Sequence, residues 1–285
     1  MKKHINKRLS LWDIVYAILF AIVVLSMVFL VRSCHAPSKI PDSFSVTALD
    51  VGQGQSIVLY SDGFTAVVDC GSSSVPDAGI KTGKYLLSTG CDKIDYLILS
   101  HYHSDHTNGL PQLADIVDID TILLPFPPAE DSYISDRIVS LADRSGINLV
   151  YVSEDLSLKL GNAELTLFAP LGSETENENC VIVLCSQEGF DVLMTADAPS
   201  DIEYRLLQHN DLPDIEILIA GHHGSAGSTS QDLLDTVLPE IAIISVGENE
   251  YGHPAASLLK RLEANGIAVY RTDESGNITF SPEKR

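Results

Sequence analysis

The chain has 285 residues, 45% hydrophobic and 20% charged, which is typical of a globular protein with one or two domains. Lys and Arg number 18 against 39 Asp and Glu, and the resulting net charge of -21 argues against a broadly basic nucleic-acid-binding surface. The five cysteines are too scattered for a disulfide scaffold or a zinc ribbon. This composition does not exclude a polyanionic ligand that metal ions hold at one place on the protein.

The N-terminal segment predicts a membrane anchor. Residues 11–31 are apolar except for Asp13, and this run is long enough to span a bilayer as a helix. Basic residues are concentrated before the run, so the positive-inside rule places the N-terminus in the cytoplasm: Lys2, Lys3, Lys7 and Arg8. The rest of the chain is then expected outside the cytoplasm, attached to the cell membrane by a single pass.

Two alternatives exist for this segment. A cleaved signal peptide would give a secreted protein, although its apolar region is normally shorter. A lipoprotein signal ending at Cys34 is the second alternative, and Arg32 fits its cleavage site poorly. We expect an uncleaved anchor, and we divide the chain into a basic tail, the anchor, a proline-containing linker and one domain: residues 1–10, 11–31, 32–43 and 44–285.

From residue 44 onward the hydrophobic pattern alternates between strands and helices. Apolar runs predict strands at 44–50, 55–60, 65–69, 95–100, 121–124, 148–152, 164–168, 181–184, 191–195, 215–220, 241–246 and 267–271. Helical spacing predicts helices at 84–88, 110–117, 132–144, 201–208, 231–237 and 255–265. Strand clusters with interleaved helices are typical of a layered α/β sandwich.

The segment after the strand at 95–100 is the most informative part of the chain. His101 and His103 are two residues apart, so in extended backbone their imidazoles leave on the same side. Asp105 and His106 follow where the chain turns, and can point at a second position a few ångström away. Neutral imidazole and carboxylate are the ligands that hold zinc, manganese or iron. This loop therefore predicts a metal site.

Other strand ends also carry side chains suited to metal binding or acid–base chemistry. Taken singly, Asp69 is a turn residue, and Asp197 and His253 are helix caps. His222 and His223 end a buried strand at a Gly/Ser loop, which can offer backbone N–H groups to an anion. Because active sites of α/β folds collect on loops at strand ends, we expect these residues to share one site with the loop at 101–106.

The HxHxDH pattern at 101–106 resembles that of the metallo-β-lactamase superfamily. With further motifs it is similar to the β-lactamase-like domain of ComEC-type DNA-uptake proteins, over residues 44–281: LDVGQGQ at 49–55, Asn179 before an apolar strand, TAD at 195–197, GHHGS at 221–225, YGHP at 251–254 and TDESG at 272–276. The sequence contains no multi-helix channel domain, so the expected protein is the hydrolase module on a single anchor.

The resemblance implies a four-layer αββα sandwich that binds two divalent metal ions, zinc or manganese. By this resemblance, His101 and His103 hold the first ion, and Asp105 and His106 hold the second. Asp197 bridges the two ions. Two divalent ions about 4 Å apart lower the pKa of a bridging water towards neutrality and supply hydroxide.

The resemblance also assigns the remaining residues. His222 completes the second site, and His223 either contacts the substrate or supports a ligand from behind, although the sequence does not distinguish the two histidines. Asp105, His223 and His253 are the residues expected to take part in catalysis. Residues expected near the substrate or behind the ligands are Asp50, Gln53, Asp69, Asn179 and Ser225.

Several positions depart from the patterns of the superfamily or of the ComEC-type domain. Asn179 and Cys180 stand where many superfamily members have a histidine that binds the first metal. Asn179 fits the ComEC-type variant, whereas Cys180 stands where a serine is usual there. Cys180 is either a thiolate ligand or a small buried residue, and free cysteine is commonly buried. Gln55 replaces a common aspartate, and Ala196 replaces a common glycine.

These observations predict a membrane-anchored, extracytoplasmic, metal-dependent hydrolase. A phosphodiesterase or nuclease is the first expectation, with DNA or another phosphodiester polymer as the substrate. A hydrolase of small esters, lactones or lactams is the second. A metal-binding module without turnover is the third, and the retention of the complete HxHxDH pattern with Asp197 and His222 argues against it.

Overall fold

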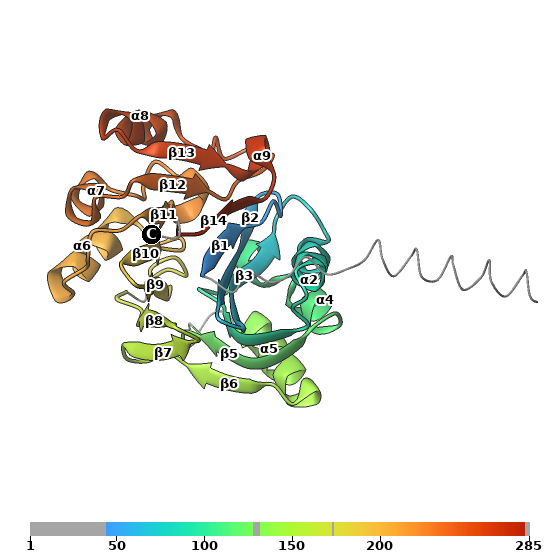
Figure 1. Ribbon diagram of the computed structural model, residues 1–285. Coiled ribbons are helices and arrows are strands. Elements are labelled where there is room, and N and C mark those ends of the chain that lie inside the picture. The colour runs from blue at the N-terminus through green and yellow to red at the C-terminus, as the bar shows by residue number, and fades with distance from the viewer. Residues whose placement is uncertain (1–43, 128–131, 173, 283–285) are drawn as a thin grey trace, which may run out of the picture. The chain divides into compact units, whose positions relative to one another are not determined.

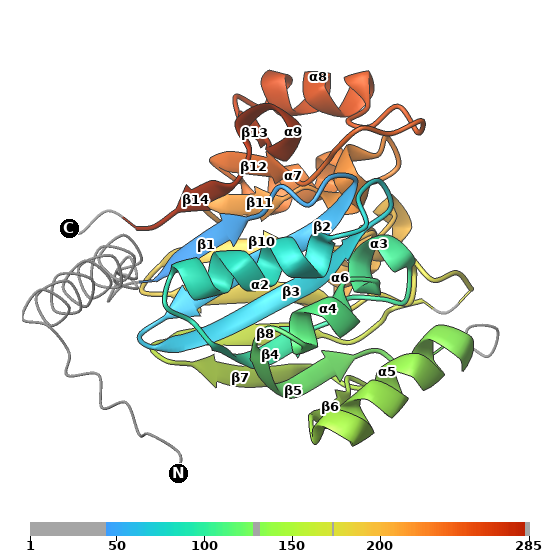
Figure 2. The ribbon, with the colours of Figure 1, turned by 90° about the vertical axis from the view of Figure 1, so that its right-hand side faces the viewer.

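Two seven-stranded β-sheets pack face to face, and helices cover their outer faces (Figures 1 and 2). The computed structural model describes residues 44–127, 132–172 and 174–282. Within these ranges the arrangement is the predicted four-layer αββα sandwich. The predicted tail, anchor and linker at residues 1–43 lie outside the described residues. No helix within the described ranges is long and apolar enough to cross a membrane.

The first sheet combines the first six strands of the chain with its last strand. Its spatial order is β14 (Ile278–Phe280), β1 (Ser45–Ala48), β2 (Gly54–Ser61), β3 (Phe64–Ser72), β4 (Lys93–Ile98), β5 (Asp118–Leu124) and β6 (Asn148–Tyr151). Strands β3 to β6 are parallel. The helices on this side are α2 (Ala78–Ser88), α3 (Ser104–Thr107), α4 (Leu110–Ala114) and α5 (Ser132–Ser145).

The second sheet is built entirely from the C-terminal half. Its order is β13 (Ala268–Arg271), β12 (Ile241–Ile244), β11 (Ile217–Ile219), β10 (Phe190–Met194), β9 (Ile182–Gln187), β8 (Ala163–Phe168) and β7 (Leu156–Leu160). Strands β10 to β13 are parallel. Its helices are α6 (Ser200–His209), α7 (Gln231–Val237) and α8 (Ala256–Ala264), with the short α9 (Thr272–Ser275) after β13.

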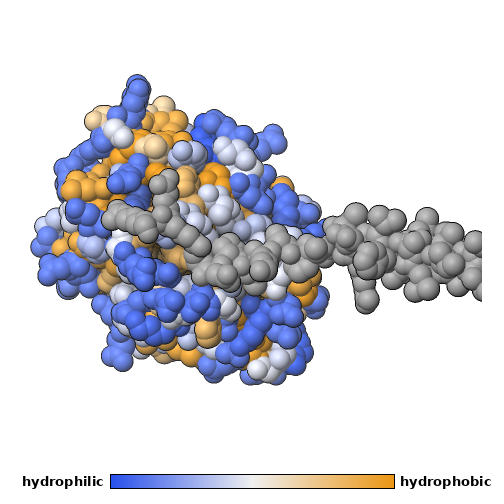
Figure 3. Space-filling view, viewed as in Figure 1, coloured by the Kyte–Doolittle hydropathy of each residue, from blue (hydrophilic) through white to orange (hydrophobic). Residues whose placement is uncertain are grey.

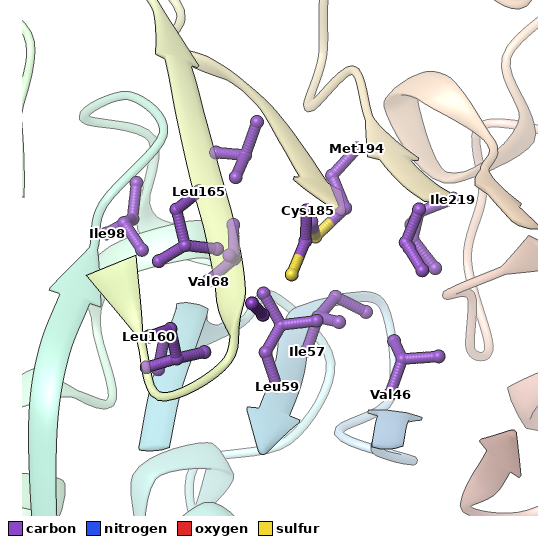
Figure 4. Packing of buried hydrophobic residues seen from close by; sticks show 14 of the residues in the cluster. Val46, Ile57, Leu59, Val68, Ile98, Leu160, Leu165, Cys185, Met194 and Ile219 are labelled. Atoms are coloured by element: carbon purple, nitrogen blue, oxygen red, sulfur yellow. The ribbon is translucent and has the colours of Figure 1, made fainter. Parts of the chain in front are cut away.

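Side-chain alternation along the strands builds the layers. On β2, Ile57 and Leu59 enter the core between the sheets, whereas Val58 and Tyr60 face the helices. Figure 4 shows the inter-sheet core, where side chains of the first sheet meet those of β8 to β11: Val46, Ile57, Leu59 and Val68 against Leu165, Cys185, Met194 and Ile219. Hydrophilic side chains cover much of the face in Figure 3, with apolar residues between them.

The parallel strands determine where the loops with the candidate residues meet. The carboxyl ends of parallel strands lie at the same edge of a sheet, and ligands bind outside those ends. The loops after β3, β4 and β5 leave the first sheet at this edge, and those after β10, β11 and β12 leave the second. Helix α3, which belongs to the loop after β4, marks this edge in Figure 2.

Helix α2 is longer than its sequence predicts, because it begins at Ala78 rather than at residue 84. Gly79 and Gly83 weaken the helical signal, since glycine is a poor helix former. In the structure they allow α2 to pack closely on the segment that contains α4. A Cβ atom at Gly79 would come within 2.0 Å of the Gly109 carbonyl oxygen, and one at Gly83 would come within 2.7 Å of the Ile116 side chain.

Candidate metal centre

The loop between β4 and α3 brings its ligand-type side chains together as its spacing predicts. The Nε2 atom of His101 lies 3.1 Å from Nδ1 of His103. Asp197, which follows β10 of the other sheet, places Oδ2 3.8 Å from His101 Nε2. The ligand atoms of these three residues all lie within 4.8 Å of one another, so they can hold one ion.

A second group of ligand atoms lies beside the first. It consists of Asp105, His106 and His223, again with all ligand atoms within 4.8 Å of one another. The carboxylate of Asp197 lies between the groups: its Oδ1 atom is 3.2 Å from His106 Nε2 and 3.8 Å from His223 Nε2. Because Oδ1 faces one group and Oδ2 faces the other, Asp197 has the position of a bridging ligand.

Divalent metal ions fit this arrangement. Among the described residues, Nε2 of His106, Oδ1 of Asp197 and Nε2 of His223 are buried without a hydrogen-bond partner. A buried polar atom left unpaired costs about 1–3 kcal/mol. Here three such atoms converge, and all three have lone pairs suited to a divalent cation once the imidazole nitrogens are deprotonated.

The backbone directs His222 and His223 to different places. Both residues have left-handed backbone angles, with φ of 50° and 52°, which is uncommon outside glycine and typical of strained functional loops. His223 donates from Nδ1 to the Ser245 carbonyl oxygen at 3.0 Å, so its Nε2 is free to bind metal. His223 therefore joins Asp105 and His106, the place that the sequence expectation gave to His222.

His222 lies on the other side of the bridging carboxylate. Its Nε2 is 3.4 Å from Asp197 Oδ2, the oxygen that also faces His101. One third of the His222 side chain is exposed, whereas His223 is buried. His222 is thus open to solvent and to a bound substrate, and lies next to the first ligand group. The ring of His253 follows at 5.5 Å from that of His222.

Asp69 supports the metal loop from behind. Its buried carboxylate accepts hydrogen bonds from the Ser100 backbone N–H (2.7 Å), the Ser100 hydroxyl (2.8 Å), Gln55 Nε2 (2.8 Å) and His106 Nδ1 (2.7 Å). The last bond orients the His106 ring with Nε2 toward Asp197. Ser100 and Gln55 were not among the predicted site residues, although Gln55 belongs to the LDVGQGQ motif and Ser100 opens the metal loop.

The structure places the other predicted residues around the centre rather than in it. Gln53 is buried and accepts the Gly247 N–H at Oε1, so it joins the loops of the two sheets. The Asp50 side chain accepts the Gly52 N–H. The Ser225 hydroxyl accepts the Gly227 N–H.

Asn179 and Cys180, which stand where many superfamily members have a metal-binding histidine, belong to neither ligand group. Asn179 donates from Nδ2 to the Phe126 carbonyl oxygen at 2.8 Å. Cys180 is buried, with Sγ 3.9 Å from the Thr195 carbonyl oxygen, and burial raises the pKa of its thiol. A thiol with a raised pKa stays protonated, so Cys180 is a small core residue.

The charges at this centre shift the pKa values of His106 and Asp197, and these shifts couple metal binding to proton release. Burial alone would lower the pKa of His106, but the carboxylates of Asp197 and Asp69 outweigh it and raise that pKa well above 6.5. Burial opposes ionisation of Asp197, yet His106 and His223 lower the pKa of this carboxyl well below its ordinary value. These opposite charges favour a protonated His106 beside an ionised Asp197 in the metal-free protein, with the second proton on the nitrogen that faces Asp197.

Metal binding should accordingly release about one proton at neutral pH, because His106 must lose its Nε2 proton to become a ligand. Calorimetric titration of the metal-free protein in two buffers of different ionisation enthalpy measures this release. In the His106→Gln variant the buffer dependence should largely vanish, whereas His209→Gln, at the exposed end of α6, should retain it. Equal binding enthalpies in the two buffers for the unmodified protein would contradict the assignment.

Comparison with known proteins agrees with this geometry. Residues 49–126, which include the metal loop, match the model of the metallo-beta-lactamase superfamily. The chain has the metallo-β-lactamase fold and resembles ComEC-type competence proteins. It is 26% identical to ComE operon protein 3 of Bacillus subtilis over 210 residues, which are 70% of this chain and 26% of that protein. It is 27% identical to competence protein ComA of Neisseria gonorrhoeae over 252 residues, 86% of this chain and 33% of that one.

A solved structure shares the fold. The metallo-β-lactamase fold protein YhfI of Bacillus subtilis superimposes with a TM-score of 0.56 at 14% identity, covering 84% of this chain and all of that chain. The matched regions span about a quarter to a third of the length of the two competence-type relatives.

Proposed function

We propose that the protein is a metal-dependent phosphodiesterase that cleaves DNA or another phosphodiester polymer. The observation that carries this proposal is the pair of ligand groups joined by Asp197, whose unpaired atoms converge. Two ions held there would activate a water molecule and neutralise charge on a phosphoryl oxygen. The names of the relatives, which include a competence protein, support a nucleic-acid substrate.

The protein's own residues contribute positioning and proton transfer. Asp69 and the Ser245 carbonyl hold the rings of His106 and His223 in place. His222 lies at the open side of the centre, where its partly exposed ring can contact a phosphoryl oxygen. Burial lowers the pKa of His253, so its ring is neutral at pH 7 and can accept or pass on a proton beside the substrate.

A substrate panel tests the proposal. The full-length protein in detergent is assayed with single-stranded DNA, a chromogenic phosphodiester and a chromogenic cephalosporin, with zinc or manganese and beside His103→Ala. We expect metal-dependent cleavage of the phosphodiesters, lost in the variant. Turnover of the cephalosporin alone would favour the small-ester or lactam alternative. Metal binding without any turnover would favour the non-catalytic module.

Ionic strength gives a second readout in the same assay. The net charge of -21 repels a polyanion, and salt screens such repulsion. Moderate salt or excess divalent ion should therefore improve cleavage of DNA until salt competes at the site itself. A small neutral ester should show little of this dependence.

We also propose that residues 11–31 anchor the protein in the cell membrane with the hydrolase domain outside the cytoplasm. The basic residues before this apolar run support that orientation. Protease added to intact protoplasts should release a soluble fragment that contains the metal centre, while a cytoplasmic marker stays intact. Full protection of the domain under the same conditions would contradict this topology.

A further inference from the structure

Exposed aromatic rings follow strands of both sheets whose neighbouring loops carry the candidate ligands, and another stands at the start of α5. Phe126, which follows β5, is 56% exposed, and Tyr133 at the start of α5 is 70% exposed. Tyr251, which follows β12 of the other sheet, is also 70% exposed. Large aromatic side chains are costly to leave in water, so a group of them beside a candidate active site points to a ligand.

The Phe126 ring is held in a fixed orientation. It stacks on Tyr151 with ring centroids 4.7 Å apart and an interplanar angle of 8°. Its backbone carbonyl accepts a hydrogen bond from Asn179, and the carbonyl of the preceding Pro125 accepts one from the Tyr102 hydroxyl at 2.7 Å. Phe126 is thus a rigid aromatic plane with one face supported by Tyr151 and more than half of its surface open.

Short connections join these rings to the ligands. Tyr102, which anchors the segment before Phe126, stands between His101 and His103 in the metal loop. On the side of the second sheet, the Tyr251 ring lies 5.8 Å from that of His253, which in turn lies 5.5 Å from that of His222. A chain that lies across the metal centre therefore meets aromatic rings from both sheets.

A cavity of about 500 Å³ lies between α5 and the segment that contains α3 and α4. It is lined by Tyr133 and Arg137 of α5 and by Ser104 and Thr107, which flank the ligands Asp105 and His106. The Arg137 guanidinium lies 5.7 Å from the Tyr133 ring centroid, a cation–π arrangement that keeps the charge beside the aromatic face. Asp136 also lines this cavity, and its negative charge weakens the attraction of the cavity for anions.

We propose that Phe126, Tyr133 and Tyr251 form a base-stacking subsite for single-stranded nucleic acid, which presents the phosphodiester between stacked bases to the metal centre. This inference rests on the proposed phosphodiesterase function. The acidic domain offers few cations for phosphate contacts, so affinity has to come from another source. Stacking of bases on aromatic rings supplies such affinity, and a duplex hides the base faces that it requires.

A measurement of oligonucleotide binding tests the proposal independently of catalysis. Full-length protein in detergent is titrated with a fluorescein-labelled single-stranded phosphorothioate oligonucleotide, and affinity is followed by fluorescence anisotropy. The Phe126→Leu/Tyr133→Leu variant keeps apolar bulk but loses the aromatic planes. We expect its Kd to rise at least about tenfold. Tyr204→Leu, which removes a 52% exposed tyrosine of α6, should leave the Kd unchanged.

An abasic strand of the same length separates stacking from other contacts. It should bind the unmodified protein at least as weakly as the double variant binds the normal strand. The double variant retains only Tyr251 of the subsite, so it should distinguish the two strands much less than the unmodified protein does. Equal binding of normal and abasic strands by the unmodified protein would overturn the proposal and would favour a phosphodiester polymer without bases. An unchanged Kd in the double variant would also overturn the proposal.

The chromogenic phosphodiester tests the underlying function separately. A diester without a nucleobase is used, so its hydrolysis by the unmodified protein reports on the metal centre. If the unmodified protein distinguishes normal from abasic strands but hydrolyses no phosphodiester, the stacking subsite stands and the proposed catalytic function fails. If it hydrolyses the phosphodiester but binds both strands equally, the function stands and the subsite fails.

Discussion

Replacement of Asp197 by alanine should remove at least one ion of the proposed metal pair and reduce the proposed phosphodiester cleavage more than about 100-fold. Asp197 Oδ1 and Oδ2 face different ligand groups, so a single substitution takes a ligand from both sites. Loss of residues that only support ligands costs about 10- to 100-fold in metal affinity or activity, and loss of a shared ligand should exceed this. Metal analysis of the purified full-length variant gives the stoichiometry.

Asp191→Ala is the matched control for this substitution. Asp191 lies on β10, the same strand that precedes Asp197, but it belongs to neither ligand group. The control should retain both ions and full activity. An unchanged metal content in Asp197→Ala would rule out the bridging role. Each histidine-containing group would then hold its ion without a shared ligand.

Replacement of Asp69 by alanine should lower both stability and metal affinity. The substitution leaves four buried donors without their acceptor: the Ser100 N–H and hydroxyl, Gln55 Nε2 and His106 Nδ1. With about 1–3 kcal/mol for each unpaired group and incomplete additivity, the free energy of unfolding should fall by at least about 3 kcal/mol. Urea denaturation followed by circular dichroism measures this loss.

The same variant should bind metal about 10- to 100-fold more weakly, because His106 loses the partner that fixes its ring. Asp143→Ala, on the exposed face of α5, serves as the control and should change neither quantity appreciably. Wild-type metal affinity in Asp69→Ala would show that the orientation of His106 does not depend on this carboxylate.

Local sequence patterns predicted most of the layers and the centre of the site. Period-two apolar alternation identified strands such as β2, whose two faces enter different cores. The C-terminal strand β14 escaped prediction because it has three residues, too few for a periodic signal, and gains its place by pairing with β1. Helix α2 was predicted too short because glycine is a poor helix former, whereas in the structure its glycines allow close packing on the segment that contains α4.

The spacing of His101, His103, Asp105 and His106 on one strand-to-helix loop was enough to predict that their side chains converge. The different placement of the adjacent His222 and His223 could not be predicted and became visible in the folded protein. Both are imidazoles at one strand end, so no local pattern distinguishes them. Their left-handed backbone and the Ser245 carbonyl after β12 turn His223 toward Asp105 and leave His222 at the solvent side of Asp197.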